Sequence, residues 1–237
     1  MKKTIFSLLA FAFLCMFSST AHAADLGKLD KVEDILIPDG KNAVIVQKIT
    51  AVTNDKGEVA FPLYSKSKIS KVEASKGNIA EKPKTVENGN QKYNLITFNE
   101  KKAEVAFEVT MNKESIYEGK KAKLGDTFPD GVLTIENKVV NTSPNDIKAY
   151  SAKLAVPKGK ELLNIVDFDA GKAFSITEKD GYVFGGFDFG TISAGKETKL
   201  AINILNPLKT HVAFVWVAAV ILSAAFMIKN KHLLNKA

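Results

Sequence analysis

The chain has 237 residues, a net charge of +7 and an isoelectric point near 9.2. Apolar residues make up 46% and charged residues 25% of it, which is normal for folded domains and excludes a disordered or fibrous chain. A basic isoelectric point first suggests a nucleic acid or an anionic membrane as partner, so the positions of the lysines have to be considered.

The N-terminus, residues 1–23, has the pattern of a signal peptide. Two lysines precede the apolar run Ile5–Phe17, which is too short to span about 30 Å of hydrocarbon. Ala21 and Ala23 supply the small side chains that signal peptidase accommodates. We therefore expect cleavage after Ala23 and export of the chain that follows.

The next segment, residues 24–112, is predicted to be a first β domain. Its beginning, residues 24–34, is polar with few apolar side chains and is predicted to be a helical or irregular lead-in. Alternation and β-branched runs then predict strands at residues 43–52, 58–63, 67–74, 91–98 and 103–111. The lysine-rich stretch 113–130 is predicted to be a linker or long loop, with an edge hairpin of one large sandwich as the alternative.

Residues 131–208 are predicted to be an immunoglobulin-like β-sandwich. Short strands at intervals of about 8–12 residues, without a convincing amphipathic helix, are typical of this architecture. These strands are predicted at residues 131–141, 147–156, 161–168, 173–177, 182–189 and 198–205. The predicted fold class is therefore all-β, with one or two sandwich domains, a cleaved signal peptide and a single C-terminal transmembrane helix.

Four residues of this second segment carry a resemblance to known domains. Asn141 follows a β-run, Pro157 and Gly159 follow the end of a strand, and Gly195 lies in the turn before the last strand. On this pattern, residues 131–205 resemble bacterial immunoglobulin-like domains of the NEW3 or DUF11 kind. The resemblance implies a structural or binding spacer on an exported protein, without a reaction.

An aromatic stretch near the end of this segment is a candidate binding surface. It combines several glycines with four aromatic residues, Tyr182, Phe184, Phe187 and Phe189. Flat rings could stack on a carbohydrate or a peptide, and glycines would let the ligand approach. The alternative is that the rings fill the core, with the paired glycines forming a bulge that shifts the alternation.

Asp167 and Asp169 flank Phe168 and would face the same side of a strand. Such a pair could bind or cleave a glycan, and the alternative is a solvated strand end before a turn. Residues 24–208 contain no cysteine, histidine or tryptophan, which argues against zinc, copper and haem sites and against histidine-assisted nucleophiles. We therefore expect no enzyme activity, no metal site and no cofactor, although calcium, which prefers oxygen ligands, stays open.

The C-terminal residues 210–228 are predicted to be a membrane helix. The run Val212–Ile228 carries no charge and extends over about 25 Å as a helix. Trp216 is a typical interfacial aromatic near the outer end. The flanking lysines are Lys209, Lys229, Lys231 and Lys236. Because lysines mark the cytoplasmic side, we expect residues 229–237 in the cytoplasm and residues 24–209 outside it.

A cell-wall sorting signal is the alternative for this helix and its basic tail. Such signals need a pentapeptide of the LPXTG or NPQTN type before the helix. The stretch 206–210 has one residue too many between its proline and its threonine. A permanent anchor is therefore the favoured interpretation.

Together these patterns predict a non-enzymatic, single-pass membrane protein of a bacterial envelope, acting as an accessory, scaffold or adhesion module through protein contacts. The alternative is a glycan-binding or carboxylate-based glycan-cleaving surface protein. Six of the 33 lysines lie in the signal peptide or beside the helix, and 27 remain against 26 acids in residues 24–208. Since this segment is nearly neutral, the expected partners are membrane lipid, through residues 210–228, and a periplasmic or cell-surface protein, without nucleic acid.

Overall fold

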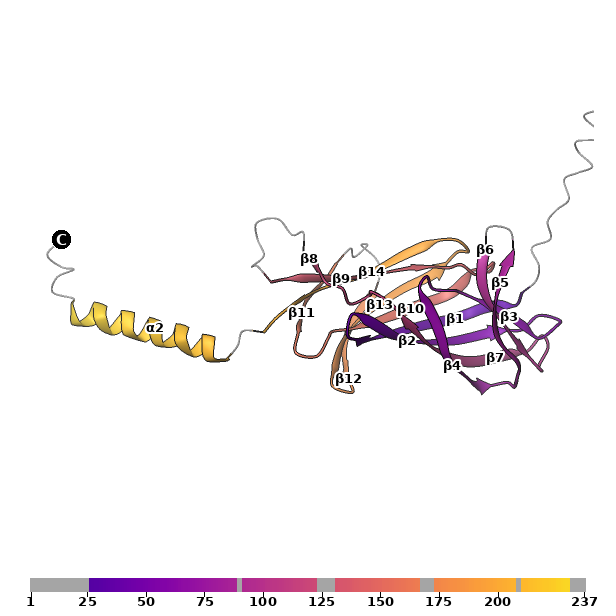
Figure 1. Cartoon of the computed structure of the whole chain (residues 1–237), viewed down its shortest axis with the longest axis horizontal. Coiled ribbons are helices and arrows are strands. Elements are labelled where there is room, and N and C mark those ends of the chain that lie inside the picture. The colour runs from indigo at the N-terminus through magenta and orange to yellow at the C-terminus, as the bar shows by residue number, and fades with distance from the viewer. Residues whose placement is uncertain (1–25, 89–90, 123–130, 167–172, 208–209, 231–237) are drawn as a thin grey trace, which may run out of the picture.

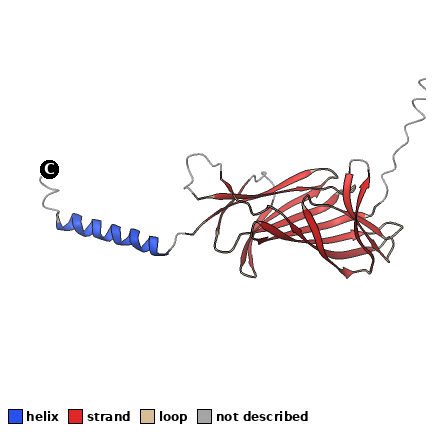
Figure 2. Ribbon diagram, viewed as in Figure 1, coloured by secondary structure: helices blue, strands red, loops and turns tan. Residues whose placement is uncertain are grey.

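The computed structural model describes residues 26–88, 91–122, 131–166, 173–207 and 210–230. Apart from one helix, the regular elements of these residues are strands (Figure 2). Fourteen strands form three sheets within the described ranges. The predicted all-β class is thus confirmed, and the predicted signal peptide lies outside the described residues.

The three sheets combine strands that are far apart in the sequence (Figure 1). In spatial order, the seven-stranded sheet contains β12 (Ala173–Lys179), β13 (Tyr182–Ile192), β10 (Ile147–Ala155), β1 (Lys28–Asp39), β2 (Asn42–Val52), β7 (Glu104–Lys113) and β4 (Ser67–Lys76). The four-stranded sheet contains β11 (Glu161–Val166), β14 (Glu197–Leu205), β9 (Leu133–Val140) and β8 (Lys120–Lys121). The three-stranded sheet contains β3 (Glu58–Phe61), β6 (Gln91–Phe98) and β5 (Ile79–Asn88).

All three sheets share one hydrophobic core. Its buried cluster includes Val32 of β1, Ile202 of β14 and Phe98 of β6. The ring of Phe107 on β7 lies 5.7 Å from that of Phe61 and 5.4 Å from that of Phe98, measured between centroids. The two smaller sheets therefore pack on the same face of the seven-stranded sheet, which gives a sandwich with a continuous interior.

Strand β1 lies in the middle of the seven-stranded sheet. It pairs antiparallel with β2 and parallel with β10. The prediction of a helical or irregular lead-in over residues 24–34 is therefore wrong from Lys28 onward. The register shifts between Leu29 and Lys31, so the buried residues Leu29 and Val32 are three positions apart. This irregularity interrupts the period of two and hides the strand from pattern analysis.

The pairing of β1 with β10 brings the two predicted β segments into one sheet. Strands β1, β2, β4 and β7 belong to residues 24–112, whereas β10, β12 and β13 belong to residues 131–208. Between them, Ile116 and Tyr117 are buried, and the Tyr117 hydroxyl donates a 3.0 Å hydrogen bond to the backbone oxygen of Leu36. The described part of the stretch 113–130 thus supplies core side chains as well as strand β8.

The residues behind the immunoglobulin-like resemblance have local structural roles. Asn141 is buried, and its side-chain amide donates hydrogen bonds of 2.8 and 3.1 Å to the backbone oxygens of Asn145 and Ile192. Gly159 and Gly195 have φ angles of 76° and 74°, a backbone conformation that favours glycine. The shared pattern therefore reflects turns and a cross-strand anchor that suit a β-sandwich.

Pattern analysis also missed strand β5, which lies at an edge of the three-stranded sheet. Its sequence, IAEKPKTVEN, holds four charged residues and Pro83. An edge strand has solvent on one side and tolerates proline, which cannot donate a ladder hydrogen bond. A polar, proline-containing strand gives no apolar alternation to detect.

Helix α2 (Thr210–Lys229) occupies the predicted membrane segment. Its window Val212–Lys229 has a mean hydropathy of 2.2, and none of it is buried inside the structure. Its length and composition are sufficient to cross a membrane. The helix therefore fits a single-pass membrane protein.

Because the core is shared, a cavity in one half should destabilise both. Leu154 on β10 is completely buried in the common core, so we expect Leu154→Ala to lower the free energy of unfolding by about 2–5 kcal/mol. Hydrogen exchange of the full-length protein in detergent micelles should show equal loss of protection in β2 and in β14. Loss confined to strands after residue 131 would contradict a common core.

Candidate functional site

A polar cluster lies inside the sandwich, between the seven-stranded sheet and the loop after β3. It contains Asp34 of β1, Gln47 of β2, Tyr150 of β10 and Tyr64, which follows β3, and all four are at most 4% exposed. The strand register places Asp34 directly opposite Gln47, and Tyr150 opposite Val32, two residues before Asp34. Pairing of three strands thus assembles the cluster.

Three of the four hydrogen bonds within this cluster converge on the Asp34 carboxylate. Gln47 Nε2 donates to Oδ1 at 3.0 Å, and the Tyr150 hydroxyl donates to Oδ2 at 2.7 Å. The Tyr64 hydroxyl also donates to Oδ2, and it accepts a 2.8 Å hydrogen bond from Gln47 Nε2. The carboxylate therefore accepts three hydrogen bonds in an interior that excludes it from bulk water.

Burial determines the proton affinities in the cluster. Desolvation raises the pKa of Asp34, while hydrogen bonds from Tyr64, Tyr150 and Gln47 oppose this shift. Desolvation and the neighbouring Asp34 raise the pKa values of Tyr64 and Tyr150 well above their usual range. Both phenols therefore stay protonated and remain donors to the carboxylate at ordinary pH.

Lys113, the last residue of β7, connects this cluster to the opposite sheet. Its ammonium donates a 2.7 Å hydrogen bond to Oδ1 of Asn137 on β9, and it lies 5.5 Å from the centre of the Tyr64 ring. Burial lowers the pKa of Lys113, and the charge of Asp34 opposes this shift. A cavity of about 400 Å³ opens beside Lys113, between Lys66, Lys120 and β9.

The buried oxygen Oε1 of Gln47 has no hydrogen-bond donor among the described groups. A buried acceptor without a partner reduces stability by about 1–3 kcal/mol. The cluster consists of a carboxylate, two phenols and an amide, and all four side chains are buried away from solvent. We interpret it as a structural junction. It joins β1, β2, β10 and the loop after β3.

A second polar feature lies on the outer face of the seven-stranded sheet. It is a hollow of about 830 Å³ lined by residues of β1, β2, β4 and β7 and by Ile79 of β5 (Ile79–Asn88). Four of its side chains form a row across the strands, in which Glu33 is opposite Lys48, Lys48 opposite Glu108, and Glu108 opposite Glu73. Glu33 forms a 2.7 Å ion pair with Lys153 of β10, and this interaction lowers the pKa of Glu33.

The like-charged neighbours Glu73 and Glu108 are the unusual members of this row. Carboxylates placed directly opposite each other on adjacent strands repel. Glu73 is compensated by a 2.7 Å ion pair with Lys71, but both of these side chains are more than half exposed, so the pair contributes little. A cation placed above β7 would therefore gain attraction from two carboxylates.

The four aromatic residues that the sequence suggested as a binding surface lie in two pairs on β13. Phe184 and Phe187 are buried, and the Phe187 and Phe189 rings stack with centroids 6.0 Å apart. The Tyr182 ring lies 6.2 Å from that of Phe184, and Lys158 Nζ lies 5.0 Å from its centre. Phe184 and Phe187 therefore offer no exposed face to a ligand, whereas Tyr182 and Phe189 are only partly buried, and a binding surface at these two rings stays a prediction.

The remaining predicted site residues belong to other parts of the chain. Asp167, Asp169, Lys209, Lys231 and Lys236 lie outside the described residues. Trp216 is 68% exposed on α2, and Lys229 is the last residue of that helix. No group of three metal-ligating side chains occurs within the described ranges.

Sequence analysis missed the buried cluster, although a signal for part of it exists. Asp34 stands between Val32 and Leu36 at an inward position, and Gln47 stands likewise between Ile45 and Ile49. A polar residue in the apolar phase of an alternating strand indicates a buried polar group. The local sequence pattern, however, does not predict that these two residues contact each other and the two tyrosines.

Comparisons with known proteins give a weak structural likeness. No protein-family model and no curated protein matches the sequence. A solved M1 zinc metallopeptidase from Deinococcus radiodurans has 10% identity and a TM-score of 0.42 over 76% of this chain and 42% of that chain. A mutant of that enzyme with a bound Tyr-Ser-Ala substrate gives 10% identity and a TM-score of 0.43 over the same shares.

A putative protease from Parabacteroides distasonis gives 10% identity and a TM-score of 0.39 over 78% of this chain and 41% of that chain. The chain therefore spans less than half the length of these proteins. Likeness at this level assigns neither an activity nor a substrate to it.

The raised pKa of Asp34 predicts a stability difference that depends on pH. A folded-state pKa above the unfolded value of about 3.8 means that the folded state retains the proton longer. The stability of the wild type relative to Asp34→Asn should therefore fall as pH rises from about 4, and level off above the folded-state pKa. Chemical denaturation of both proteins between pH 4 and pH 8 measures this difference. A constant difference across the range would contradict the shift.

Proposed function

We propose that the chain is a non-enzymatic binding protein, anchored in the membrane of a bacterial envelope with its sandwich on the extracytoplasmic side. The signal-peptide pattern before residue 24 and the lysines after α2 support this orientation. The immunoglobulin-like pattern of residues 131–205 supports a domain of the NEW3 or DUF11 kind. Such a protein acts as an accessory subunit, scaffold or adhesion module.

The observation that carries this proposal is the charged hollow on the outer face of the seven-stranded sheet. Small-molecule sites are mostly apolar and concave, whereas this hollow is lined by Lys31, Lys48, Glu33, Glu73 and Glu108 among others. Charges of both signs on a rigid sheet favour a protein partner, because complementary charges select the partner and its register. The partner is expected to place a lysine or arginine above Glu73 and Glu108.

Charge reversal within the hollow tests this proposal. We expect Glu108→Lys to reduce recovery of the co-purifying partner about tenfold or more after extraction of the full-length protein in mild detergent. Like charges that face each other across an interface typically cost over about 1.4 kcal/mol, which is a factor of ten. Glu87→Lys, an exposed change near the end of β5 that lies away from the hollow, is the matched control.

Two results would count against the binding role. The first is a solitary wild-type monomer after extraction in mild detergent. The second is equal recovery of the partner with Glu108→Lys and with Glu87→Lys.

The orientation has its own test. We expect protease added to intact spheroplasts to digest the sandwich, while an epitope tag placed after Ala237 stays protected until the membrane is permeabilised. Lysines retained on the cytoplasmic side are the reason for this expectation. Digestion of the tag in intact spheroplasts would reverse the proposed topology.

A further inference from the structure

Exposed apolar side chains of the sandwich gather at one edge. Among its described residues, the large hydrophobic side chains that are exposed are Ile69 at 37%, Leu163 at 37%, Phe174 at 56% and Ile176 at 60%. Three of these four lie on β11 and β12. Soluble surfaces rarely concentrate apolar side chains in this way without a binding role.

Strands β11 and β12 are the edges of two packed sheets. β12 ends the seven-stranded sheet and β11 ends the four-stranded one. They lie on the same side of the sandwich, because a Cβ on Gly185 of β13, which is paired with Ile176 of β12, would lie 3.9 Å from the side chain of Ile165 on β11. Leu163 lies two residues before Ile165, at the register shift of β11, and we call the exposed side of these two edge strands the β11–β12 edge.

The opposite edge of the large sheet has different chemistry. Strand β4 carries Lys68, Lys71 and Lys76, and lysines on an edge strand prevent association with other chains. Strand β12 carries a single lysine, Lys179, at its end beside the hairpin turn. One edge is therefore protected by charge, and the other presents apolar side chains.

The β11–β12 edge lies at the end of the sandwich from which the chain enters α2. Leu205, the last residue of β14, pairs with Glu161, the first residue of β11. Lys160 donates a hydrogen bond to the side chain of Asn206. Four residues, 206–209, connect Leu205 to Thr210. At roughly 3.5 Å for each of the five Cα–Cα steps, the Cα atoms of Leu205 and Thr210 are at most about 18 Å apart.

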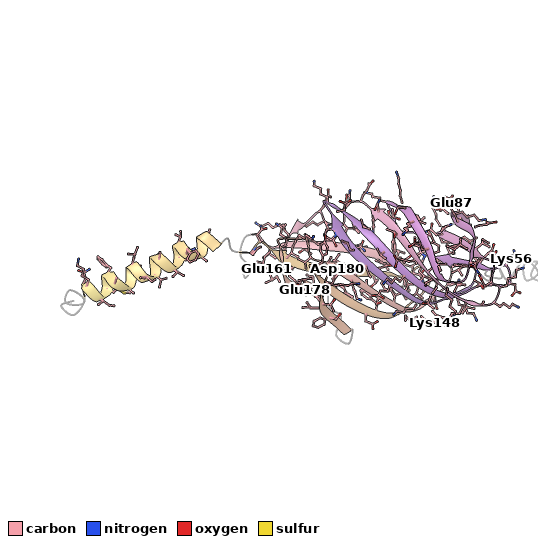
Figure 3. All side chains as sticks on the ribbon, turned by 90° about the horizontal axis from the view of Figure 1, so that it is seen from below. Lys56, Glu87, Lys148, Glu161, Glu178 and Asp180 are labelled. Atoms are coloured by element: carbon pink, nitrogen blue, oxygen red, sulfur yellow. The ribbon has the colours of Figure 1, made fainter. Side chains whose placement is uncertain are left out.

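The turn of the β12–β13 hairpin lies at this same end. Lys158, in the turn before β11, has its ammonium 5.0 Å from the centre of the Tyr182 ring, which follows the hairpin turn Asp180–Gly181. Figure 3 shows Glu161, Glu178 and Asp180 together at the end of the sandwich next to α2. The hairpin and the start of β11 are therefore close to the membrane surface if α2 spans the bilayer.

We propose that the β11–β12 edge lies on the lipid bilayer into which α2 is inserted, with Leu163 and Ile176 in the interfacial layer. This inference rests on the proposed anchoring by α2. A short tether keeps the local concentration of the bilayer high, so a modest apolar surface is enough to hold the sandwich against it. Tyr182 and Lys158 fit this place, because an aromatic ring and a lysine with an apolar stem both suit the boundary between lipid and water.

The driving force is apolar burial, without a net electrostatic contribution. The charged side chains at the end of this edge next to α2 include three lysines and three acids, namely Lys158, Lys160, Lys179, Glu161, Glu178 and Asp180. They balance in sign, so anionic lipid neither gains nor loses overall attraction. The bilayer contact holds the sandwich in one orientation, which leaves the outer sheet hollow directed away from lipid and accessible to a protein partner.

Tryptophan fluorescence of the full-length protein in nanodiscs tests the contact. Trp216 is the only tryptophan of the chain, so Trp216→Phe gives a silent background for Ile176→Trp. We expect blue-shifted emission and at least twofold quenching by brominated phosphatidylcholine. In the same background, Ile69→Trp on β4 is the matched control, with red-shifted emission and little quenching.

Three further measurements make the result decisive. Leu163→Trp in the same background should repeat the behaviour of Ile176→Trp and guards against misfolding of a single variant. Quenching of Trp216 in the wild type reports the anchor itself, so a failed anchor is distinguished from a failed contact. Anionic lipid and 0.5 M salt should leave the signals unchanged, as expected for a contact without net charge (about one Debye length of 4–5 Å at that salt).

The contact is overturned if Trp216 is quenched while the tryptophans at positions 163 and 176 are not. It is also overturned if their quenching requires anionic lipid or disappears in salt, because a charged surface would then be responsible. Quenching of the Ile69→Trp control to the same extent would show non-specific adsorption and would equally overturn the proposal.

Discussion

The parallel pairing of β1 with β10 is the interaction on which the rest of the structure depends. β1 has β2 on one side and β10 on the other, so it joins residues from the first and second halves of the chain. Without this pairing, the large sheet would divide into a four-stranded part, β1-β2-β7-β4, and a three-stranded part, β12-β13-β10. Each part would expose inward-facing side chains that now share one core.

The same strand explains why a carboxylate is tolerated in that core. Asp34 lies on β1, and its hydrogen-bond donors come from β2, β10 and the loop after β3. A carboxylate without these donors would face a large desolvation cost. The donors in turn are oriented by the carboxylate, so the cluster forms only when β1 has found both neighbours. We interpret the cluster as a feature that stabilises this strand arrangement relative to alternative pairings.

Rigidity at the centre also matters for the outer surface. The charged row from Glu33 to Glu73 crosses four strands whose inner faces are fixed by the core. Interactions that are fixed before binding lose little entropy on association. A sandwich connected to its helix by four residues then presents this row in a limited range of orientations, which suits a contact between neighbours in one membrane.

By itself, the sequence determined the elements with strong local signals. Alternation predicted strands such as β7 and β10, the turn signal at residues 179–181 predicted the β12–β13 hairpin, and an uncharged apolar run predicted α2. Each of these signals depends only on neighbours a few residues away. β1 and β5 escaped, one through its register shift and the other through its polar edge composition. The tertiary structure alone decided that β1 pairs with β10, that Asp34 meets two tyrosines, and that three exposed apolar side chains gather on the edge strands β11 and β12. These features bring together residues that are far apart in the chain. No local sequence pattern encodes these contacts, because packing of the common core determines which strands become neighbours.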